Sequence, residues 1–250
     1  MFNNRNSFLN GIPVVVKNLI LINILMWFAT IILPNAAGID LQSILGLHYF
    51  GSQGFKPIQI ISYMFMHANF GHLFFNMFAL FMFGSVIERT WGQKRFLTYY
   101  MITGIGAGLI QMLTLYIQIQ NVQAGLSPEM LKEAYTEGAN VLARGMNYSD
   151  IAMGKLNLLL NTTTVGASGA VFGLLLAFAI MFPNMPLFLM FIPIPVKAKY
   201  MVIGYGLLEF FFGVANRSGD NVAHFAHLGG MLFGLLLILW WKNRKMNFYN

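Results

Sequence analysis

A serine and two histidines are the residues of this chain best suited to covalent chemistry. Ser168 stands in the segment Gly-Ala-Ser-Gly at 166–169, and His224 and His227 lie three residues apart further along the chain. A serine hydroxyl is a poor nucleophile until a neighbouring base takes its proton, and histidine is the side chain that most often does so. The pattern therefore indicates nucleophilic catalysis, provided that the fold brings Ser168 to one of these histidines.

Polar side chains suited to stabilising an oxyanion stand in a third segment. His72 and Asn76 are four residues apart, so on a helix they would share one face. An imidazole and an amide on that face can donate hydrogen bonds to a developing oxyanion. A polar pair that only forms hydrogen bonds between two membrane helices would have the same spacing in the sequence. His67 precedes this segment, and we expect a structural role for it.

The elements that must position these residues are helices in a membrane. Hydrophobic residues make up 57% of the 250 residues and charged residues 9%, a composition typical of multi-span membrane proteins. Each crossing helix needs about 17–25 mainly apolar residues. Six runs approach this length, at 14–33, 71–88, 96–117, 163–182, 200–215 and 221–241. We therefore expect an all-α integral membrane protein, a six-helix bundle that forms one domain over residues 1–250.

The segments between the predicted spans indicate how the chain is oriented. With both termini in the cytoplasm, inner segments hold ten of the fifteen Lys and Arg residues and outer segments hold five, in agreement with the positive-inside rule. The net charge of +7 is thus assigned to the flanks of the membrane spans, and we expect no nucleic-acid partner. We expect a multi-pass protein of a bacterial cytoplasmic membrane. The short apolar run at 187–196 contains two prolines and is placed at the inner interface.

This topology brings the candidate residues to one depth, near the outer face. His72 lies in the second span, Ser168 in the fourth and His227 in the sixth, each close to its outer end. Small residues recur every four positions along the fourth and sixth spans and would let the two backbones approach closely: Gly169, Gly173 and Ala177, and Ala226, Gly230 and Gly234. If these faces meet, Ser168 and His227 come within reach of each other. A Gly230→Leu change would then force the spans apart, and Gly230→Ala would be far milder.

His224 and His227 compete for the role of the base. His227 is favoured because it lies one turn deeper in the span, next to the small-residue face. Asp220 can pair with His224 four residues later, but it lies about 10 Å along the helix axis from His227. Glu88 and Glu209 also stand inside predicted spans, where ionisable groups are costly and each is a functional hypothesis. We find no acid placed to orient His227, so we expect a Ser–His dyad and a structural His224.

Two outer segments are unusually long. The segment 35–70 is too apolar for a solvated loop, and we expect it to lie in the membrane interface. The segment 118–161 is an extra polar loop, in which Ser127 and the following Pro128 predict the start of a helix that runs to about Ala143. This loop is either a lid or docking element for substrates, or a solvated excursion without a role.

Four stretches of the sequence resemble the rhomboid family of intramembrane serine proteases. They are HANFGHLFFN at 67–76, ERTWG at 88–92, GASG at 166–169 followed by Gly173, and AHLGGMLFG at 226–234. Any one of these motifs is a weak signal. All four occur in order at matching spans, and the resemblance covers nearly all of residues 10–240, so together they are specific.

The resemblance implies an endopeptidase that cleaves transmembrane proteins in the lipid bilayer near the outer interface, without a cofactor or a metal. It implies that Ser168 is the nucleophile and that His227 is the general base. His72, Asn76 and the backbone N–H of Ser168 would form the oxyanion hole.

The resemblance also assigns roles to whole segments. It implies that 35–70 is a membrane-embedded first loop and that the fifth span gates the access of substrates. The chain departs from the family pattern in two places. Phe172 stands where many relatives carry a Tyr stacked under the catalytic imidazole, and the loop 118–161 is longer than in simple members.

Two other functions compete with that of a protease. A catalytically inactive rhomboid-like protein would bind membrane helices without cutting them, but such relatives typically lack the Ser or the His, and this chain has both. A metalloenzyme or transporter would use the histidines at positions 67, 72, 224 and 227. No H-E-x-x-H motif occurs, and no carboxylate stands beside His72 or His227 in the sequence.

Overall fold

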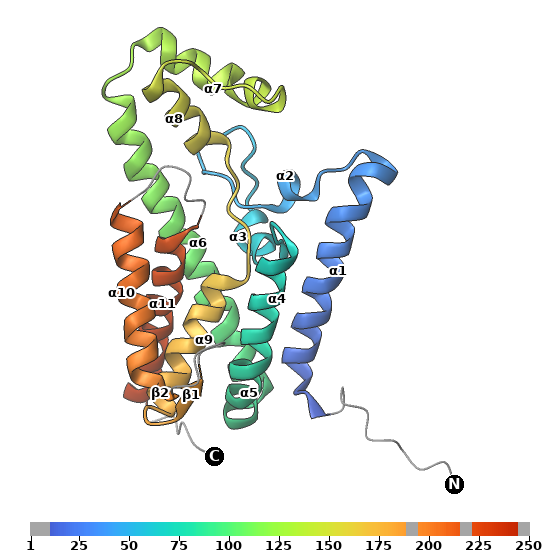
Figure 1. The fold of residues 1–250 in the computed structure, drawn as a ribbon, viewed down its shortest axis with the longest axis vertical. Helices are drawn as coiled ribbons and strands as arrows, with labels where there is room; N and C mark the ends of the chain where they lie inside the picture. Colours follow the sequence, from blue (N-terminus) through green and yellow to red (C-terminus); the bar gives the residue numbers. More distant parts are fainter. Residues whose placement is uncertain (1–10, 189–194, 216–221, 245–250) are drawn as a thin grey trace.

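The computed structural model describes residues 11–188, 195–215 and 222–244 and is mostly helical. Its elements, in chain order, are α1 (Val14–Ala37), α2 (Leu41–Leu45), α3 (Gln59–Ser62), a 3₁₀ turn (Tyr63–Phe65), α4 (Phe70–Ala79), a π-helical turn (Leu80–Gly84), α5 (Ser85–Trp91), α6 (Gln93–Gln123), α7 (Pro128–Ala143), α8 (Ile151–Asn161), α9 (Ser168–Met181), β1 (Pro186–Phe188), β2 (Pro195–Lys197), α10 (Ala198–Ala215) and α11 (His224–Asn243). Figure 1 shows the long helices side by side in a bundle, with α7 and α8 beyond one end of it.

Five helical stretches of the described residues are long and apolar enough to cross a membrane: α1, the continuous helix Phe70–Trp91, α6, α10 and α11. The chain is thus a multi-pass integral membrane protein. The fourth predicted span corresponds to α9, whose 14 residues are about 21 Å long and fall short of a hydrocarbon core of about 30 Å. Residues 162–167, which lead into α9, are not helical. The predicted count of six spanning helices is therefore not confirmed.

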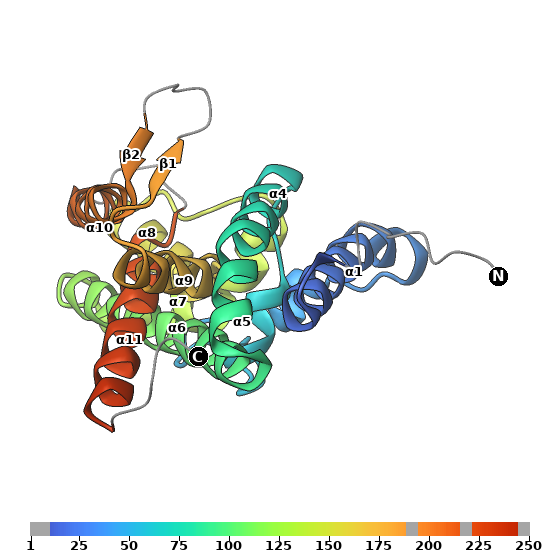
Figure 2. The same cartoon turned by 90° about the horizontal axis from the view of Figure 1, so that it is seen from below.

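The central helix of the bundle is α9. It contacts α6 and α11 and also touches α4, α5 and α10, and ten of its fourteen residues are buried. Figure 2 shows α9 among α5, α6, α10 and α11, whereas α1 lies apart at the edge of the bundle. A helix surrounded by other helices is apolar on all sides. In α9 this holds for every residue except the first one, Ser168.

The small residues of α9 and α11 meet at one level only. A Cβ atom added to Gly230 would overlap the carbonyl oxygen of Gly169, so the two backbones touch there. Deeper in the bundle, Tyr99 of α6 fills the space beside Gly234, and its hydroxyl donates to the carbonyl of Gly173 at 2.9 Å. The predicted close approach is correct at Gly230, but the deeper glycines make room for α6. Because a backbone oxygen faces Gly230, even the Cβ of alanine requires the backbones to move apart there, so Gly230→Ala should also destabilise the bundle.

The first loop, residues 38–69, folds back onto the bundle. Leu47 and Thr164 pair through backbone hydrogen bonds of 2.8 and 2.9 Å. The N–H of Gly166 donates to the carbonyl of Tyr63 at 2.9 Å, and the hydroxyl of Tyr63 donates to the carbonyl of Gly104 in α6 at 2.7 Å. The loop thereby holds the extended stretch that leads into α9. The apolar residues that predicted an interfacial segment supply this packing, and five of them are buried: Leu47, Tyr49, Tyr63, Met64 and Met66.

The extra outer loop 118–161 is folded and has a core of its own. The hydroxyl of Ser127 accepts a hydrogen bond from the N–H of Met130 at 3.3 Å, so the predicted start of α7 is confirmed. Helix α8 was not predicted; it begins after Asp150, whose carboxylate accepts from the N–H of Met153 at 2.8 Å. Side chains of α6, α7, α8 and the first loop form a second buried cluster: Tyr49, Leu115, Ile119, Ala134, Met153, Leu156 and Leu160. This segment is therefore a folded part of the protein that packs against the first loop.

The opposite end of the bundle, where α1 begins, contains one of the two carboxylates of the predicted spans. Glu88 of α5 accepts hydrogen bonds from the N–H groups of Val15 and Val16 at 3.0 and 2.8 Å. Its side chain thus satisfies two free donors of the first turn of α1, which is a structural role. Strands β1 and β2 pair antiparallel at this end. They flank the predicted interfacial segment 187–196, of which residues 189–194 lie outside the described part of the chain.

Candidate active site

Ser168 is the first residue of α9, and its position depends on a glycine. Gly166 has a φ of 127°, a value that side chains rarely tolerate, and a Cβ there would lie 2.6 Å from the ring of His72. This backbone turn directs the chain from the extended stretch into the helix. The N–H of Ser168 belongs to the first turn of α9, where backbone donors have no partner within the helix and attract negative charge. Ser168 is partly exposed, so it is open to a reactant.

His227 stands one turn into α11 and faces Ser168. Its Nε2 lies 2.8 Å from Ser168 Oγ, within hydrogen-bond distance. Two contacts hold the imidazole there. The backbones of α9 and α11 touch one turn away at Gly230, and the ring of Phe172 stacks on the imidazole with centroids 4.3 Å apart. His227 is 8% exposed, so its ring is largely enclosed by these elements.

A carboxylate from a third helix completes the group. Glu209 of α10 places Oε2 2.6 Å from Nδ1 of His224 and 2.9 Å from Nδ1 of His227. The contact with His224 has hydrogen-bond geometry, whereas the contact with His227 has the distance of a hydrogen bond but not its direction. Sequence reasoning missed this nearby carboxylate, but the hydrogen bond that would orient His227 and overturn the expected dyad is not formed.

The reason for this error lies in distance along the chain. Glu209 is 18 residues from His227 and on another helix, so helix periodicity could not relate them. The signal in the sequence was a carboxylate within an apolar span, which is costly unless it is paired. His224 takes this carboxylate as its partner. Asp220, the partner expected for it, lies outside the described residues.

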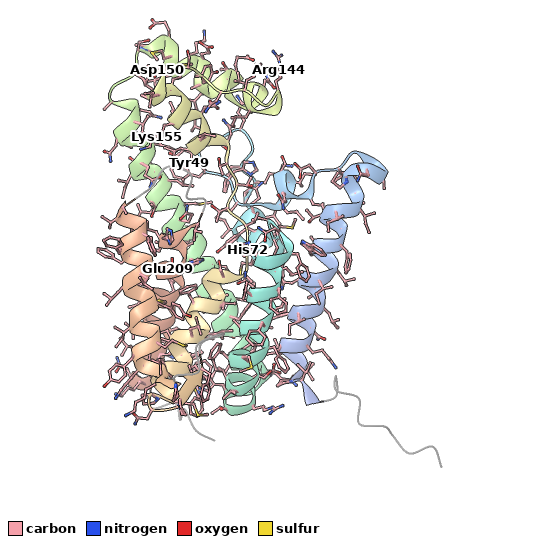
Figure 3. The ribbon with its side chains drawn as sticks, viewed as in Figure 1. Tyr49, His72, Arg144, Asp150, Lys155 and Glu209 are labelled. Atoms are coloured by element: carbon pink, nitrogen blue, oxygen red, sulfur yellow. The ribbon has the colours of Figure 1, made fainter. Side chains whose placement is uncertain are left out.

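The predicted oxyanion-hole residues lie on α4 beside the start of α9. The ring of His72 is close to Gly166, and a Cβ on Gly166 would lie 3.6 Å from Ser168 Oγ, so the imidazole and the hydroxyl share this corner. Asn76 is buried, and its Nδ2 donates to the carbonyl of His72 at 2.8 Å, which leaves the second amide hydrogen for another acceptor. Figure 3 shows His72 and Glu209 at a similar height in the bundle, in the half nearer to α7 and α8.

The histidines divide into two groups rather than forming one metal site. His67 lies against His72, with ring centroids 5.0 Å apart. Among the described residues, Glu209, His224 and His227 are the His and acidic side chains close enough to share a metal ion, with their ligand atoms within 4.8 Å of one another. The four-histidine site expected for a metalloenzyme or transporter is thus not formed.

Comparisons with known proteins match the sequence of this chain to one family. A family model described as "Rhomboid domain" matches residues 55–130 and 140–243. The chain is 29% identical over 185 residues to "Rhomboid protease AarA" of Providencia stuartii, an alignment that covers 70% of this chain and 52% of that protein.

Two further relatives come from organelles according to their names. The chain is 26% identical over 230 residues to "Rhomboid-like protein 11, chloroplastic" of Arabidopsis thaliana, covering 80% of this chain and 61% of that protein. It is 27% identical over 187 residues to "Rhomboid protein 1, mitochondrial" of Saccharomyces cerevisiae, covering 72% and 41%. The chain spans about half the length of the curated relatives that it matches.

Proposed function

Because the chain belongs to the rhomboid family, we propose that it is an intramembrane serine endopeptidase with Ser168 as the nucleophile and His227 as the general base. The observation that carries this proposal is the 2.8 Å contact between Ser168 Oγ and His227 Nε2. At this distance an unprotonated imidazole takes the hydroxyl proton as the oxygen attacks, which turns a weak nucleophile into an effective one.

Acylation proceeds from this pair. Ser168 Oγ attacks the carbonyl carbon of the scissile peptide bond while its proton passes to His227 Nε2. The resulting oxyanion is stabilised by the backbone N–H of Ser168 and by hydrogen bonds from Asn76 and His72. When the tetrahedral intermediate collapses, the C–N bond breaks, and His227 gives its proton to the leaving amine. Ser168 then carries the acyl part of the substrate as an ester.

Deacylation repeats these roles with water. His227 takes a proton from a water molecule, the hydroxyl oxygen attacks the ester carbonyl, and the released Ser168 Oγ recovers its proton from His227. Water must therefore reach the pair, and the partial exposure of Ser168 supports this requirement. Acylation and deacylation, as proposed here, use side chains and one backbone N–H of the protein together with water.

The substrates that suit this site are transmembrane proteins. Ser168 stands at the start of a short helix inside a bundle, in the half nearer to the folded outer loop. A single membrane-spanning segment would unwind near that interface and present one peptide bond. We place the protein in a bacterial cytoplasmic membrane with both termini in the cytoplasm, a topology supported by the distribution of Lys and Arg. The chain has no cysteine, so single cysteines at Gln93 and Ser127 should react selectively with impermeant reagents from the inner and the outer side.

A fluorophosphonate probe tests the function directly. The purified wild-type protein should become labelled at Ser168 and should cleave a transmembrane substrate. Ser168→Ala and His227→Ala should each abolish both reactions while the thermal unfolding of the protein stays close to that of the wild type. Because nucleophile and base act as a unit, the double variant should be no worse than either single one. Normal cleavage by the Ser168→Ala protein would end the proposal.

The same experiment separates the two alternatives. An inactive, helix-binding relative would retain substrates in a pull-down but would neither cut them nor react with the probe. A metalloenzyme would lose its activity in a chelator and would be indifferent to the fluorophosphonate. The proposed protease should react with the probe in the chelator at an unchanged rate.

A further inference from the structure

The outer half of α10 contacts α11 through Glu209 and through Phe212, whose ring centroid lies 5.8 Å from that of His224. The inner half has two buried residues, Ala198 and Val202. In the outer half, from Leu207 onward, the side chains are mainly exposed, five of them by half or more: Leu207, Leu208, Phe210, Phe211 and Val214. The side chain of Glu209, in contrast, is 15% exposed and contacts both histidines of the first turn of α11. A carboxylate inside a membrane span is costly to desolvate, so the contacts of Glu209 with the two histidines favour a position of α10 that keeps them.

The contact with His227 falls on the nitrogen that the proposed reaction leaves free. Nε2 faces Ser168, and Nδ1 faces Glu209 Oε2 at 2.9 Å. The contact lacks the direction of a hydrogen bond, so the carboxylate acts through its charge, which favours a proton on Nδ1 and leaves on Nε2 the lone pair that a general base for Ser168 needs. When His227 has taken the second proton, the nearby carboxylate stabilises the imidazolium.

We propose that Glu209 is a positioning residue for His227, so that the base is competent only while the outer half of α10 is packed against α11. The inference rests on the proposed function and deepens it, because it replaces a two-residue site with three residues from three helices. Loss of the contact between α10 and α11 removes the carboxylate, and His227 then loses both the preference for the productive tautomer and the support of its charge.

His224 offers a competing explanation that the experiment must separate. Glu209 makes its shorter contact with His224, so its role could end with fastening the two helices. If Glu209 only fastens α10 to α11, the removal of His224 should harm the reaction at Ser168 as much as the removal of the Glu209 carboxylate. If Glu209 positions His227, the removal of His224 should do less harm, because Oε2 then still contacts His227.

The test compares Glu209→Gln with His224→Gln, using the rate of Ser168 labelling by a small fluorophosphonate across pH. The titratable groups that face His227 are Glu209 on α10, His224 on α11 and His72 on α4. Glu209→Gln should slow labelling by about 10- to 100-fold, a part of the 10²–10⁴ that a whole general base contributes. The acid limb of its profile should move to lower pH, because a neutral amide stabilises the imidazolium less. His224→Gln should keep the wild-type acid limb and slow labelling much less.

A conservative variant keeps the test decisive if the amide destabilises the bundle. Glu209→Asp retains the charge at a greater distance, so it should label faster than Glu209→Gln and keep the wild-type acid limb. Equal profiles for wild type and Glu209→Gln would overturn the inference, as would an equal loss in His224→Gln. In either of these outcomes the wild-type protein still reacts at Ser168, so the proposed function would stand. Absence of labelling in the wild type would instead remove the proposed function.

Discussion

The ring of Phe172 lies parallel to the imidazole of His227, with centroids 4.3 Å apart and an angle of 5° between the planes. Phe172 is four residues after Ser168 on α9, so the helix that carries the proposed nucleophile also supports the proposed base. The stacking uses the face of the ring and needs no hydroxyl. This explains how the chain can carry Phe at a position where many rhomboid relatives carry Tyr.

Removal of this ring should weaken catalysis without abolishing it. An aromatic contact of this kind contributes about 0.5–1.5 kcal/mol, so Phe172→Leu should lower the rate of Ser168 labelling by about 2- to 10-fold. Phe172→Tyr retains the ring and should label at close to the wild-type rate. The measurement is the fluorophosphonate labelling rate of each variant. If Phe172→Leu labels as fast as the wild type, the stacking does not position the base.

Asn76→Ala should lower turnover by about 10²–10³, because one donor of an oxyanion hole contributes this much. The apparent affinity for substrate should change little, since the oxyanion forms only during the reaction. Steady-state cleavage of a transmembrane substrate separates the two quantities. A rise in KM at constant kcat would show that Asn76, which already donates to the carbonyl of His72, holds the helix or the substrate instead.

Gly230→Ala should unfold the bundle at a lower temperature than the wild type. The added Cβ overlaps the carbonyl oxygen of Gly169, and overpacking of this kind costs about 1–3 kcal/mol. Gly204→Ala is the matched control, because a Cβ there meets nothing within 4 Å and alanine favours a helix by about 0.5–1 kcal/mol. Thermal unfolding in detergent compares the two. Equal melting temperatures would mean that the α9–α11 contact yields easily.

His67 should make the protein less stable in acid. Burial, with a smaller contribution from His72, lowers the pKa of His67 from 6.5 to about 3. Between these values the unfolded chain binds a proton at His67 and the folded chain does not, so stability falls as the pH is lowered through this window. His67→Gln should flatten the dependence of the melting temperature on pH between 6.5 and 3. A variant with the wild-type slope would show that other groups cause the acid sensitivity.

The folded outer loop should influence which substrates are cut rather than the chemistry at Ser168. Helices α7 and α8 pack over Tyr49 of the first loop, and the amide of Gln53 donates to the carbonyl of Tyr135 in α7 at 3.1 Å. Figure 3 shows Asp150, Lys155 and Arg144 of this loop at the far end of the molecule from β1 and β2.

Replacement of residues 122–148 by a short Gly/Ser linker tests this role. The variant should retain labelling of Ser168 by the small probe and change the cleavage rates of full transmembrane substrates. Ala134→Glu, which buries a charge between α7 and α8, should have the same effect without a deletion. Unchanged rates on several substrates in both variants would leave the loop without a part in substrate selection.

The membrane spans could be predicted because their signal is local. A run of apolar residues must be helical in a bilayer, since no water is present to satisfy the backbone. The predicted runs coincide with α1, α4–α5, α6, α10 and α11, and the start of α7 could be read from Ser127 and Pro128. The length of α9 could not be predicted, because the apolar residues before it are extended and held by the first loop.

Part of the candidate site could also be predicted from the sequence. Ser168 and His227 could be predicted from their residue types, from their similar depth in the predicted spans and from the glycine at position 230. The structure places Ser168 Oγ and His227 Nε2 2.8 Å apart. The small-residue pattern did not reveal that two side chains of α6 fill these spaces, Thr103 beside Gly173 and Tyr99 beside Gly234. A glycine only provides room, and what fills it depends on a helix elsewhere in the chain.

The sequence by itself thus determined that this is a membrane protein, where five of its apolar helices run and which serine and histidine meet in the bundle, since each follows from the period and polarity of neighbouring residues. Tertiary structure alone decided that Glu209 contacts His227, that Glu88 caps α1 and that α8 shares a core with the first loop. Each of these contacts joins segments that are distant in the chain. Partners of this kind are selected by how whole helices pack against one another, and no local pattern in the sequence encodes them.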